Sequence, residues 1–316
     1  MIRKIRNKAK RLIHKLLVDN NLYYNQLFKD CRKFWNFREF NLNIVNLGSN
    51  SALYGFDYSV SSLKGANWAM GPQSLNQDLA ILKTYYSFIG PRGTVLVPLC
   101  PYSSCLKSYK DTEVLKYYTI LHPGVIENFS IEKQTEAYQL KQNPYKYAKK
   151  QMFKGLLKSI KRRISFHKLP ENLTYQPLSN EQLKSDAKSF IEGWKKQFKI
   201  ADMNAPIPSH IKEGRKTRIL TLKEIIQFCE DRNLNYYLVI PPVTKYLSSY
   251  FTETFKQNYI YSFLEEVNVK TERVLDYLSD KELQDKELYF NSFFLNKRGR
   301  KLFTEIVLKD IEDIIC

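Results

Sequence analysis

Residues 93–99 (GTVLVPL) constrain the fold of this 316-residue chain more than any other stretch. Their apolar run is continuous rather than alternating, which is typical of a strand buried on both faces of a parallel sheet. Parallel strands need crossover connections, usually helices, and these cover the two faces of the sheet. We therefore expect an α/β fold, in which further strands alternate with helices along the chain.

That alternation is visible on both sides of the run. We expect strands at 40–47, 66–70, 236–240 and 273–277, and helices at 72–89, 221–232, 250–267 and 297–315. Pro72 opens the first of these helices, and Thr221 is the expected N-cap of the second. The pattern predicts a three-layer α/β sandwich with a mostly parallel sheet.

The middle of the chain interrupts this pattern. Residues 104–218 are helical in periodicity, rich in lysine and broken by two Pro-containing stretches, so we interpret them as an insertion or cap. The expected organisation is a basic N-terminal helical segment at 1–38, an α/β domain formed by 39–103 and 219–316, and the helical insertion at 104–218.

The formal net charge of +18 is concentrated in two segments that contain no acidic residue. Residues 1–17 carry seven basic residues and residues 137–170 carry ten, which leaves the rest of the chain nearly neutral. Neither segment has the continuous apolar core of a signal peptide or membrane span, so we expect a cytoplasmic protein. A localised basic patch implies a localised anionic partner.

The second segment has the pattern of a basic amphipathic helix. Lysines flank apolar residues that recur at helical spacing: Met152, Phe153, Leu156, Leu157, Ile160 and Ile164. Such a helix adsorbs to anionic lipid headgroups, or it packs on the protein body with its charges in solvent. Because no zinc-finger or RNP signature accompanies the charge, we expect the inner membrane surface as partner and no specific nucleic acid.

The cysteines and histidines do not form a ligand set. Five cysteines without a CxxC pair favour reduced thiols, and the four histidines are scattered along the chain. Cys100 and Cys105 are spaced closely enough to share a metal ion, but no histidine pair accompanies them. We therefore expect neither a metal nor another cofactor.

Small polar residues cluster where the predicted strands end, and ligands of open α/β sheets bind at the carboxyl ends of strands. The clusters lie at 48–51, 65–67, 98–104 and 289–299. Gly-Ser-Asn-Ser at 48–51 is also a common turn composition, because these residues accept unusual backbone angles. The combination of the four clusters, rather than any single one, indicates a site.

This combination resembles the SGNH/GDSL hydrolase-like superfamily, particularly the branch found with bacterial surface-polysaccharide genes. The resemblance covers 40–99 and 221–308, with NLGSNSALYGFDY as the nucleophile block, GANWAM as the oxyanion block and NSFFLNKRGRKLFT as the C-terminal block. It implies an SGNH-like (flavodoxin-like) fold and ester or acyl-transfer chemistry. It also implies that Gly65 and Asn67 donate to an oxyanion, and that Asn296 contributes to substrate binding.

The positions of the family's catalytic triad are substituted in this chain. The nucleophile position holds Asn50, the aspartate position holds Asn291 and the histidine position holds Phe294. An amide or a phenyl ring cannot accept and return a proton near neutral pH. The ordinary Ser-His-Asp mechanism therefore cannot use these three positions.

Other residues offer a second route to the same chemistry. Ser49 and Ser51 lie within one residue of the nucleophile position, and either is an alternative nucleophile. The alternative bases are His122 and His167 of the insertion, and the alternative orienting acids are Asp57 and Asp276. A histidine within hydrogen-bond reach of Ser51 would support this route.

Two functions are compatible with these residues. The first, which the nearby serines favour, is acyl (acetyl) transfer or ester chemistry on a lipid-linked glycan precursor of bacterial surface polysaccharide. The second is a catalytically inactive pseudoenzyme that uses the same pocket to bind or scaffold a glycan. Direct displacement on an activated donor is a third possibility, and no phosphate-binding glycine-rich loop supports it.

Overall fold

A computed structural model of the chain describes residues 12–105, 111–164 and 178–315, which belong to two compact units. Unit 1 comprises residues 1–38 and 109–171, and unit 2 comprises residues 39–108 and 172–316. All five strands found in the described residues lie in unit 2. The segment 104–218, expected to form one insertion, is shared between the two units.

The sheet of unit 2 is parallel throughout, with the strand order β2-β1-β3-β4-β5. Its strands are β1 (Leu42–Asn46), β2 (Gly65–Asn67), β3 (Ile89–Pro98), β4 (Asn235–Ile240) and β5 (Val274–Asp276). Each expected strand is present with its ends shifted by a few residues, and the apolar run lies in central strand β3. In this order the winding direction switches between β1 and β3, where open sheets bind ligands.

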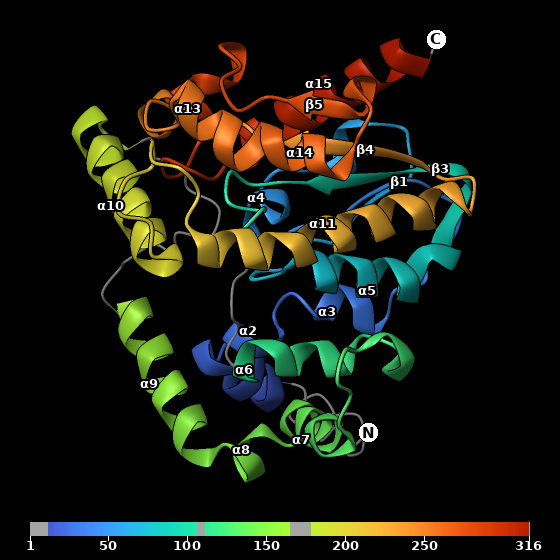
Figure 1. Cartoon of the computed structure of the whole chain (residues 1–316). Coiled ribbons are helices and arrows are strands. Elements are labelled where there is room, and N and C mark those ends of the chain that lie inside the picture. The colour runs from blue at the N-terminus through green and yellow to red at the C-terminus, as the bar shows by residue number, and fades with distance from the viewer. Residues whose placement is uncertain (1–11, 106–110, 165–177, 316) are drawn as a thin grey trace. The chain divides into compact units, whose positions relative to one another are not determined.

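Helices cover both faces of the sheet, which confirms the predicted three-layer α/β sandwich (Figure 1). The helices of unit 2 are α4 (Asn50–Leu53), α5 (Leu75–Tyr85), α10 (Asn180–Phe198), α11 (Ser209–Glu230), α12 (Lys245–Ser248), α13 (Glu253–Lys256), α14 (Ser262–Val267) and α15 (Lys297–Ile315). On one face, Phe303 and Val307 of α15 pack against Ile44, Leu96 and Val239 of the strands. Helices α5 and α11 lie side by side on the other face.

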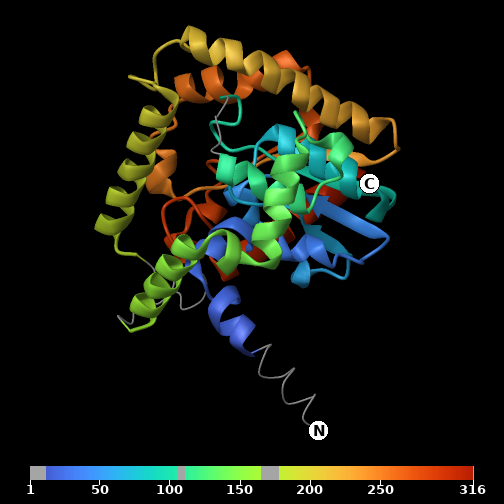
Figure 2. The same cartoon turned by 90° about the horizontal axis from the view of Figure 1, so that it is seen from below.

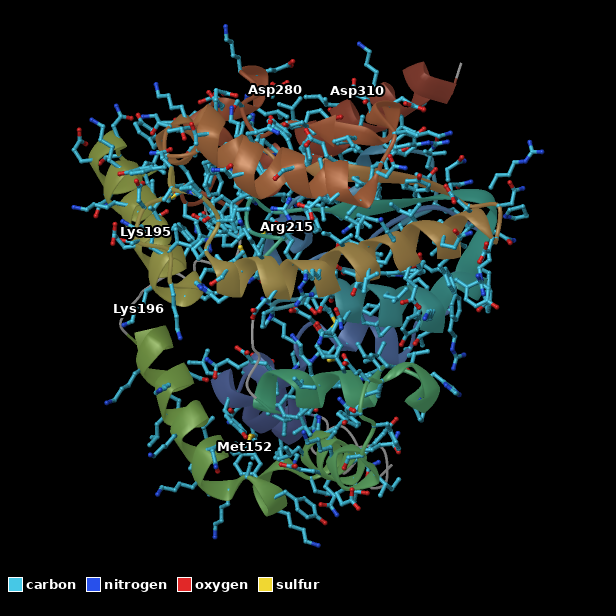
Figure 3. The ribbon with its side chains drawn as sticks, viewed as in Figure 1. Met152, Lys195, Lys196, Arg215, Asp280 and Asp310 are labelled. Atoms are coloured by element: carbon cyan, nitrogen blue, oxygen red, sulfur yellow. The ribbon has the colours of Figure 1, made fainter. Side chains whose placement is uncertain are left out.

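Helix α11 begins at Ser209, so the prediction of Thr221 as its N-cap is wrong. The sequence assigns the residues before Thr221 to the helical insertion, but in the structure they belong to α11 and bury Arg215 between α11 and α14 (Figure 3). Its guanidinium donates to the Ser262 hydroxyl and pairs with Glu266 at 2.8 Å. Helix α14 lies beside α11 in both views (Figures 1 and 2), so it supplies the partners that a buried arginine of α11 requires. The periodicity of the sequence does not reveal these partners.

The described part of unit 1 is helical. Its elements are the π-helical turn η1 (Lys15–Asp19) and the helices α2 (Leu22–Phe28), α3 (Arg32–Trp35), α6 (Asp111–Leu115), α7 (Ile131–Gln142), α8 (Pro144–Tyr147) and α9 (Lys149–Ile164). Helix α9 confirms the helix expected from the second basic segment. Across the described ranges of the chain, no helix combines the length and the apolar character needed to cross a bilayer.

Candidate functional site

Strand β1 ends in a tight turn built around Gly48. The φ angle of Gly48 is +106°, and an added Cβ would lie 2.7 Å from the Cβ of Ala52 and 3.4 Å from that of Pro98. Only glycine fits both the angle and the space. The turn leads into α4, with Ser49 as N-cap and Asn50 and Ser51 in the first turn. It therefore presents residues 49–51 at the carboxyl end of β1, next to that of β3.

A buried carboxylate holds this turn in place. Asp78 of α5 accepts hydrogen bonds from the Gly48 amide at 2.7 Å and from Gln73 Nε2 at 2.5 Å. Burial raises the pKa of Asp78 to about 6, although both hydrogen bonds and the nearby charge of Arg218 oppose the rise. Sequence reasoning missed Asp78, because an aspartate within an amphipathic helix usually marks its solvent face.

We expect the stability of Asp78→Asn relative to wild type to depend on pH. The pKa of Asp78 is raised above its unfolded value near 4, so folding favours the protonated acid. Wild-type stability relative to the variant is thus greatest below about pH 4, and falls by up to about 3 kcal/mol as the pH rises through about 6. Denaturant unfolding of both proteins between pH 4 and 7 measures this difference, and a difference that rises with pH would contradict it.

Three polar side chains are half-exposed in the turn. The Ser49 hydroxyl accepts a hydrogen bond from the Gln73 amide at 3.2 Å. The Asn50 side chain lies against Gly71, where an added Cβ would overlap Asn50 Oδ1. Within the described part of the chain, neither the side-chain amide of Asn50 nor the hydroxyl of Ser51 has a hydrogen-bond partner. Both groups are therefore available to a ligand.

The two residues expected to bind an oxyanion have other contacts. Gly65 lies at the start of β2 beneath the ring of Tyr58, which a Cβ would overlap. Asn67 Oδ1 accepts from the Ala69 amide and from Asn46 Nδ2, each at 3.0 Å. Its Nδ2 donates to three carbonyl groups at the end of α4: those of Ala52, Leu53 and Phe56. The Asn67 amide therefore fastens α4 to β2.

The asparagines of the C-terminal block shape the backbone. Asn291 Oδ1 accepts from the amides of Phe293 and Phe294, at 3.0 and 2.7 Å. Asn296 is buried and caps α15 by accepting from the Gly299 amide at 3.0 Å. Between them, Phe294 packs on Tyr54, with ring centroids 5.3 Å apart. The structure thus brings the expected histidine position to the end of α4, where it places a phenyl ring.

Within the described part of unit 2, no histidine lies beside Ser51. The one histidine of this unit, His210, is 2.8 Å from the Phe198 carbonyl oxygen through its Nε2. In unit 1, His122 Nδ1 accepts from the Gly124 amide, and His167 lies outside the described residues. The two alternative orienting acids also have partners: Asp57 accepts from the Ser59 amide, and Asp276 accepts from the Tyr261 hydroxyl.

Aromatic side chains from three elements meet beside α4 and form what we term the aromatic patch. Its half-exposed members are Tyr54, Phe190, Trp194, Phe290, Phe293 and Phe294. Phe294 is the centre, with ring centroids 4.6 Å from Phe293, 5.8 Å from Phe290 and 5.9 Å from Phe190. The guanidinium of Arg300 lies 5.4 Å from the centre of the Tyr54 ring and adds a cation to this surface.

A basic hollow of about 360 Å³ lies next to the patch. Its lining contains two lysines and no acid: Lys184, Lys245, Tyr246, Ser249 and Tyr250. Ser292, which directly precedes Phe293 of the patch, connects the patch to the hollow. Its backbone amide donates to the Asp186 carboxylate at 2.8 Å, and its carbonyl oxygen accepts from the Thr244 hydroxyl at 2.8 Å. Asp186 lies two residues after Lys184, and Thr244 directly precedes Lys245.

Sequence reasoning missed both the patch and the hollow. Phe190 and Trp194 have the i, i+4 spacing of a helix face, and the run of aromatic residues before α15 was assigned only to the triad block. No local pattern indicates that these segments meet Tyr54. Among the described residues, no group of three His, Cys, Asp or Glu side chains is placed to hold a metal ion.

Comparisons with known proteins do not identify a family for this chain. No model of a protein family matches the chain, and no curated protein matches it either.

Proposed function

We propose that this chain is an SGNH-like pseudoenzyme that binds an acidic glycan at the carboxyl ends of β1 and β3 without cleaving it. One observation carries the proposal: Phe294 packs on Tyr54 at the position where an acyl hydrolase of this kind needs a base. A site with hydrogen-bond donors but no proton acceptor can hold an acyl or sugar oxygen without breaking a bond.

The patch has the chemistry that a sugar ring requires. The faces of sugar rings carry C–H groups, which pack against flat aromatic surfaces, while the ring edges carry hydroxyls. The aromatic patch supplies half-exposed rings, and the Asn50 amide and Ser51 hydroxyl supply free hydrogen-bonding groups beside it. Apolar surface combined with a few convergent polar groups is typical of ligand sites.

The charges around the patch favour an acidic sugar. Lys184 and Lys245 line the hollow, and Arg300 lies over the Tyr54 ring. Asp186 of α10 is engaged by Ser292. A chain of sugars that carries carboxylate or phosphate groups would therefore meet both aromatic rings and cations.

Calorimetric titration with an oligogalacturonate hexamer and with uncharged maltohexaose tests the proposal. We expect the acidic hexamer to bind more tightly, Phe294→Ala to weaken that binding by about tenfold or more, and Lys184→Gln with Lys245→Gln to remove the preference for acid. Phe40→Ala is the matched control, because Phe40 is 60% exposed elsewhere on unit 2. Failure of both sugars to bind, or wild-type affinity in Phe294→Ala, would refute it.

The natural ligand in this proposal is a lipid-linked precursor of a bacterial surface polysaccharide at the cytoplasmic face of the membrane. The support for this location is the concentration of positive charge in segments outside the sheet and their amphipathic pattern.

Acyl transfer is the second candidate function, and the state of Ser51 favours it. Ser51 is half-exposed in the first turn of α4, and its hydroxyl is free of partners within the described residues. In this candidate the hydroxyl of Ser51 or Ser49 attacks the acyl carbon of an ester. The ester C–O bond breaks, the departing alcohol takes the serine proton, and an acceptor hydroxyl then takes the acyl group from the serine. Covalent labelling by a fluorophosphonate separates the two functions.

A further inference from the structure

We infer that unit 1 carries one lipid-binding face, formed jointly by residues 12–17 and α9, which adsorbs to anionic bilayers. The two basic segments are far apart in the sequence, and contacts within unit 1 bring residues 12–17 of the first beside the second. This inference concerns unit 1 alone and does not rest on the glycan site of unit 2.

The charge of the chain belongs almost entirely to unit 1. Its two chain segments, 1–38 and 109–171, contain 24 basic and 8 acidic residues, so they account for +16 of the net +18. Unit 2 contains the other 26 basic and 24 acidic residues and is nearly neutral. The long-range attraction of this chain to an anionic surface therefore acts on unit 1.

Buried contacts join α2, which follows the first basic segment in the chain, to α9 of the second. Asn21, which caps α2, is fully buried, and its Nδ2 donates to the Met152 carbonyl of α9 at 2.7 Å. The Leu22 amide donates to the Ser159 hydroxyl at 3.1 Å, about two turns further along α9. Gly155 lies between these contacts and allows the close approach, because a Cβ would come within 2.9 Å of Tyr23 Cβ. Helix α9 therefore uses its Met152 side to pack on α2 (Figure 3).

A neighbouring side of α9 remains apolar and exposed. Phe153, Leu157 and Ile160 are 49%, 60% and 44% exposed. Tyr145 links this stripe to the N-terminal segment, since its hydroxyl donates to the Leu17 carbonyl at 2.8 Å and its ring contacts that of Phe153 at 5.6 Å. The exposed apolar residues of the N-terminal segment are Leu12, Ile13 and Leu17.

Exposed apolar side chains are concentrated in this unit. Among the described residues, ten of the fourteen large exposed apolar side chains belong to unit 1. Scattered single residues of this type are normal, but a concentration marks an interaction surface. Exposed lysines flank the stripe on α9: Lys149, Lys150, Lys154 and Lys158.

An anionic bilayer is the partner that uses both properties of this face. Cations attract its headgroups, and the Phe, Leu and Ile side chains enter the boundary between headgroups and acyl chains. Nucleic acid binding depends on neutralising phosphates, so an exposed aliphatic stripe adds nothing to it. We therefore assign the face to lipid.

Co-sedimentation with vesicles tests the assignment on the full chain. The vesicles contain either 30% phosphatidylglycerol in phosphatidylcholine or phosphatidylcholine alone. One variant combines Phe153→Gln, Leu157→Gln and Ile160→Gln, and a second combines Lys149→Gln, Lys150→Gln, Lys154→Gln and Lys158→Gln. The matched controls replace exposed residues of unit 2 in the same numbers: Phe40, Tyr86 and Leu220 for the first, and Lys212, Lys216, Lys223 and Lys270 for the second.

We expect wild type and both controls to bind anionic vesicles and to bind neutral vesicles only weakly. The lysine variant should lose more than about a hundredfold in partitioning, because each cation contributes roughly a fivefold factor. The apolar variant should lose at least about tenfold. Circular dichroism verifies that both variants remain helical. Equal binding of the variants and the controls to anionic vesicles would overturn the inference. It would also be overturned if a random DNA duplex bound wild type more tightly than vesicles do and bound the apolar variant as tightly as wild type.

Discussion

Asn67→Ala is expected to lower the free energy of unfolding by about 3 kcal/mol or more. The substitution removes the hydrogen bonds of the Asn67 side chain to the Ala69 amide, the Asn46 side chain and the carbonyl groups in and after α4, and each buried group left unsatisfied costs about 1–3 kcal/mol. Asn43→Ala is the control, since the exposed Asn43 side chain accepts one hydrogen bond, from the Lys64 amide. Its loss should cost less than about 1 kcal/mol.

This result bears on the role of Asn67 in the site. If Asn67 were chiefly an oxyanion donor, its removal would abolish chemistry while changing stability little. Urea unfolding of the two variants, followed by circular dichroism, decides between these outcomes. A stability loss no greater than that of Asn43→Ala would contradict the structural role.

Gly155→Ala is expected to destabilise unit 1, whereas Gly193→Ala should stabilise the chain. In α9 an added Cβ would overlap Asn21 Oδ1 and crowd Tyr23, so α2 and α9 must separate at a cost of about 1–3 kcal/mol. In α10 a Cβ at Gly193 meets nothing within 4 Å, and alanine is favoured over glycine in a helix by about 0.5–1 kcal/mol.

The two variants make the same chemical change in two helices. Changes of opposite sign in the free energy of unfolding would therefore isolate the effect of packing. Thermal unfolding and native-state hydrogen exchange of α2 and α9 measure it. Similar effects at the two positions would show that α9 does not pack on α2 as described.

The sheet could be predicted because its physical causes are local. A strand buried on both faces requires a continuous apolar run, and residues 93–99 supply one in β3. The final helix, expected at about 297–315, is α15 (Lys297–Ile315). In contrast, the burial of Arg215 in α11 depends on another helix, where Glu266 pairs with its charge and the Ser262 hydroxyl accepts a hydrogen bond. A local pattern contains no information about such a partner.

The candidate site could be predicted only in part for the same reason. The turn at Gly48 follows from a strand end and a small-residue sequence, so its position was expected. The aromatic patch depends on Tyr54, α10 and residues 290–294 meeting in space. Likewise, each basic segment is recognisable in the sequence, but the contacts of α2 and Leu17 with the second segment are not.

The central claim is that the site at the carboxyl ends of β1 and β3 binds a ligand but carries no activated nucleophile. Intact-mass spectrometry after incubation with a fluorophosphonate probe tests it most directly, because such probes form adducts only with activated serines. We predict no adduct on Ser49 or Ser51 in protein that binds the oligogalacturonate hexamer. An adduct on either serine in wild type that disappears when that serine is replaced by alanine would contradict the account and establish acyl-transfer chemistry.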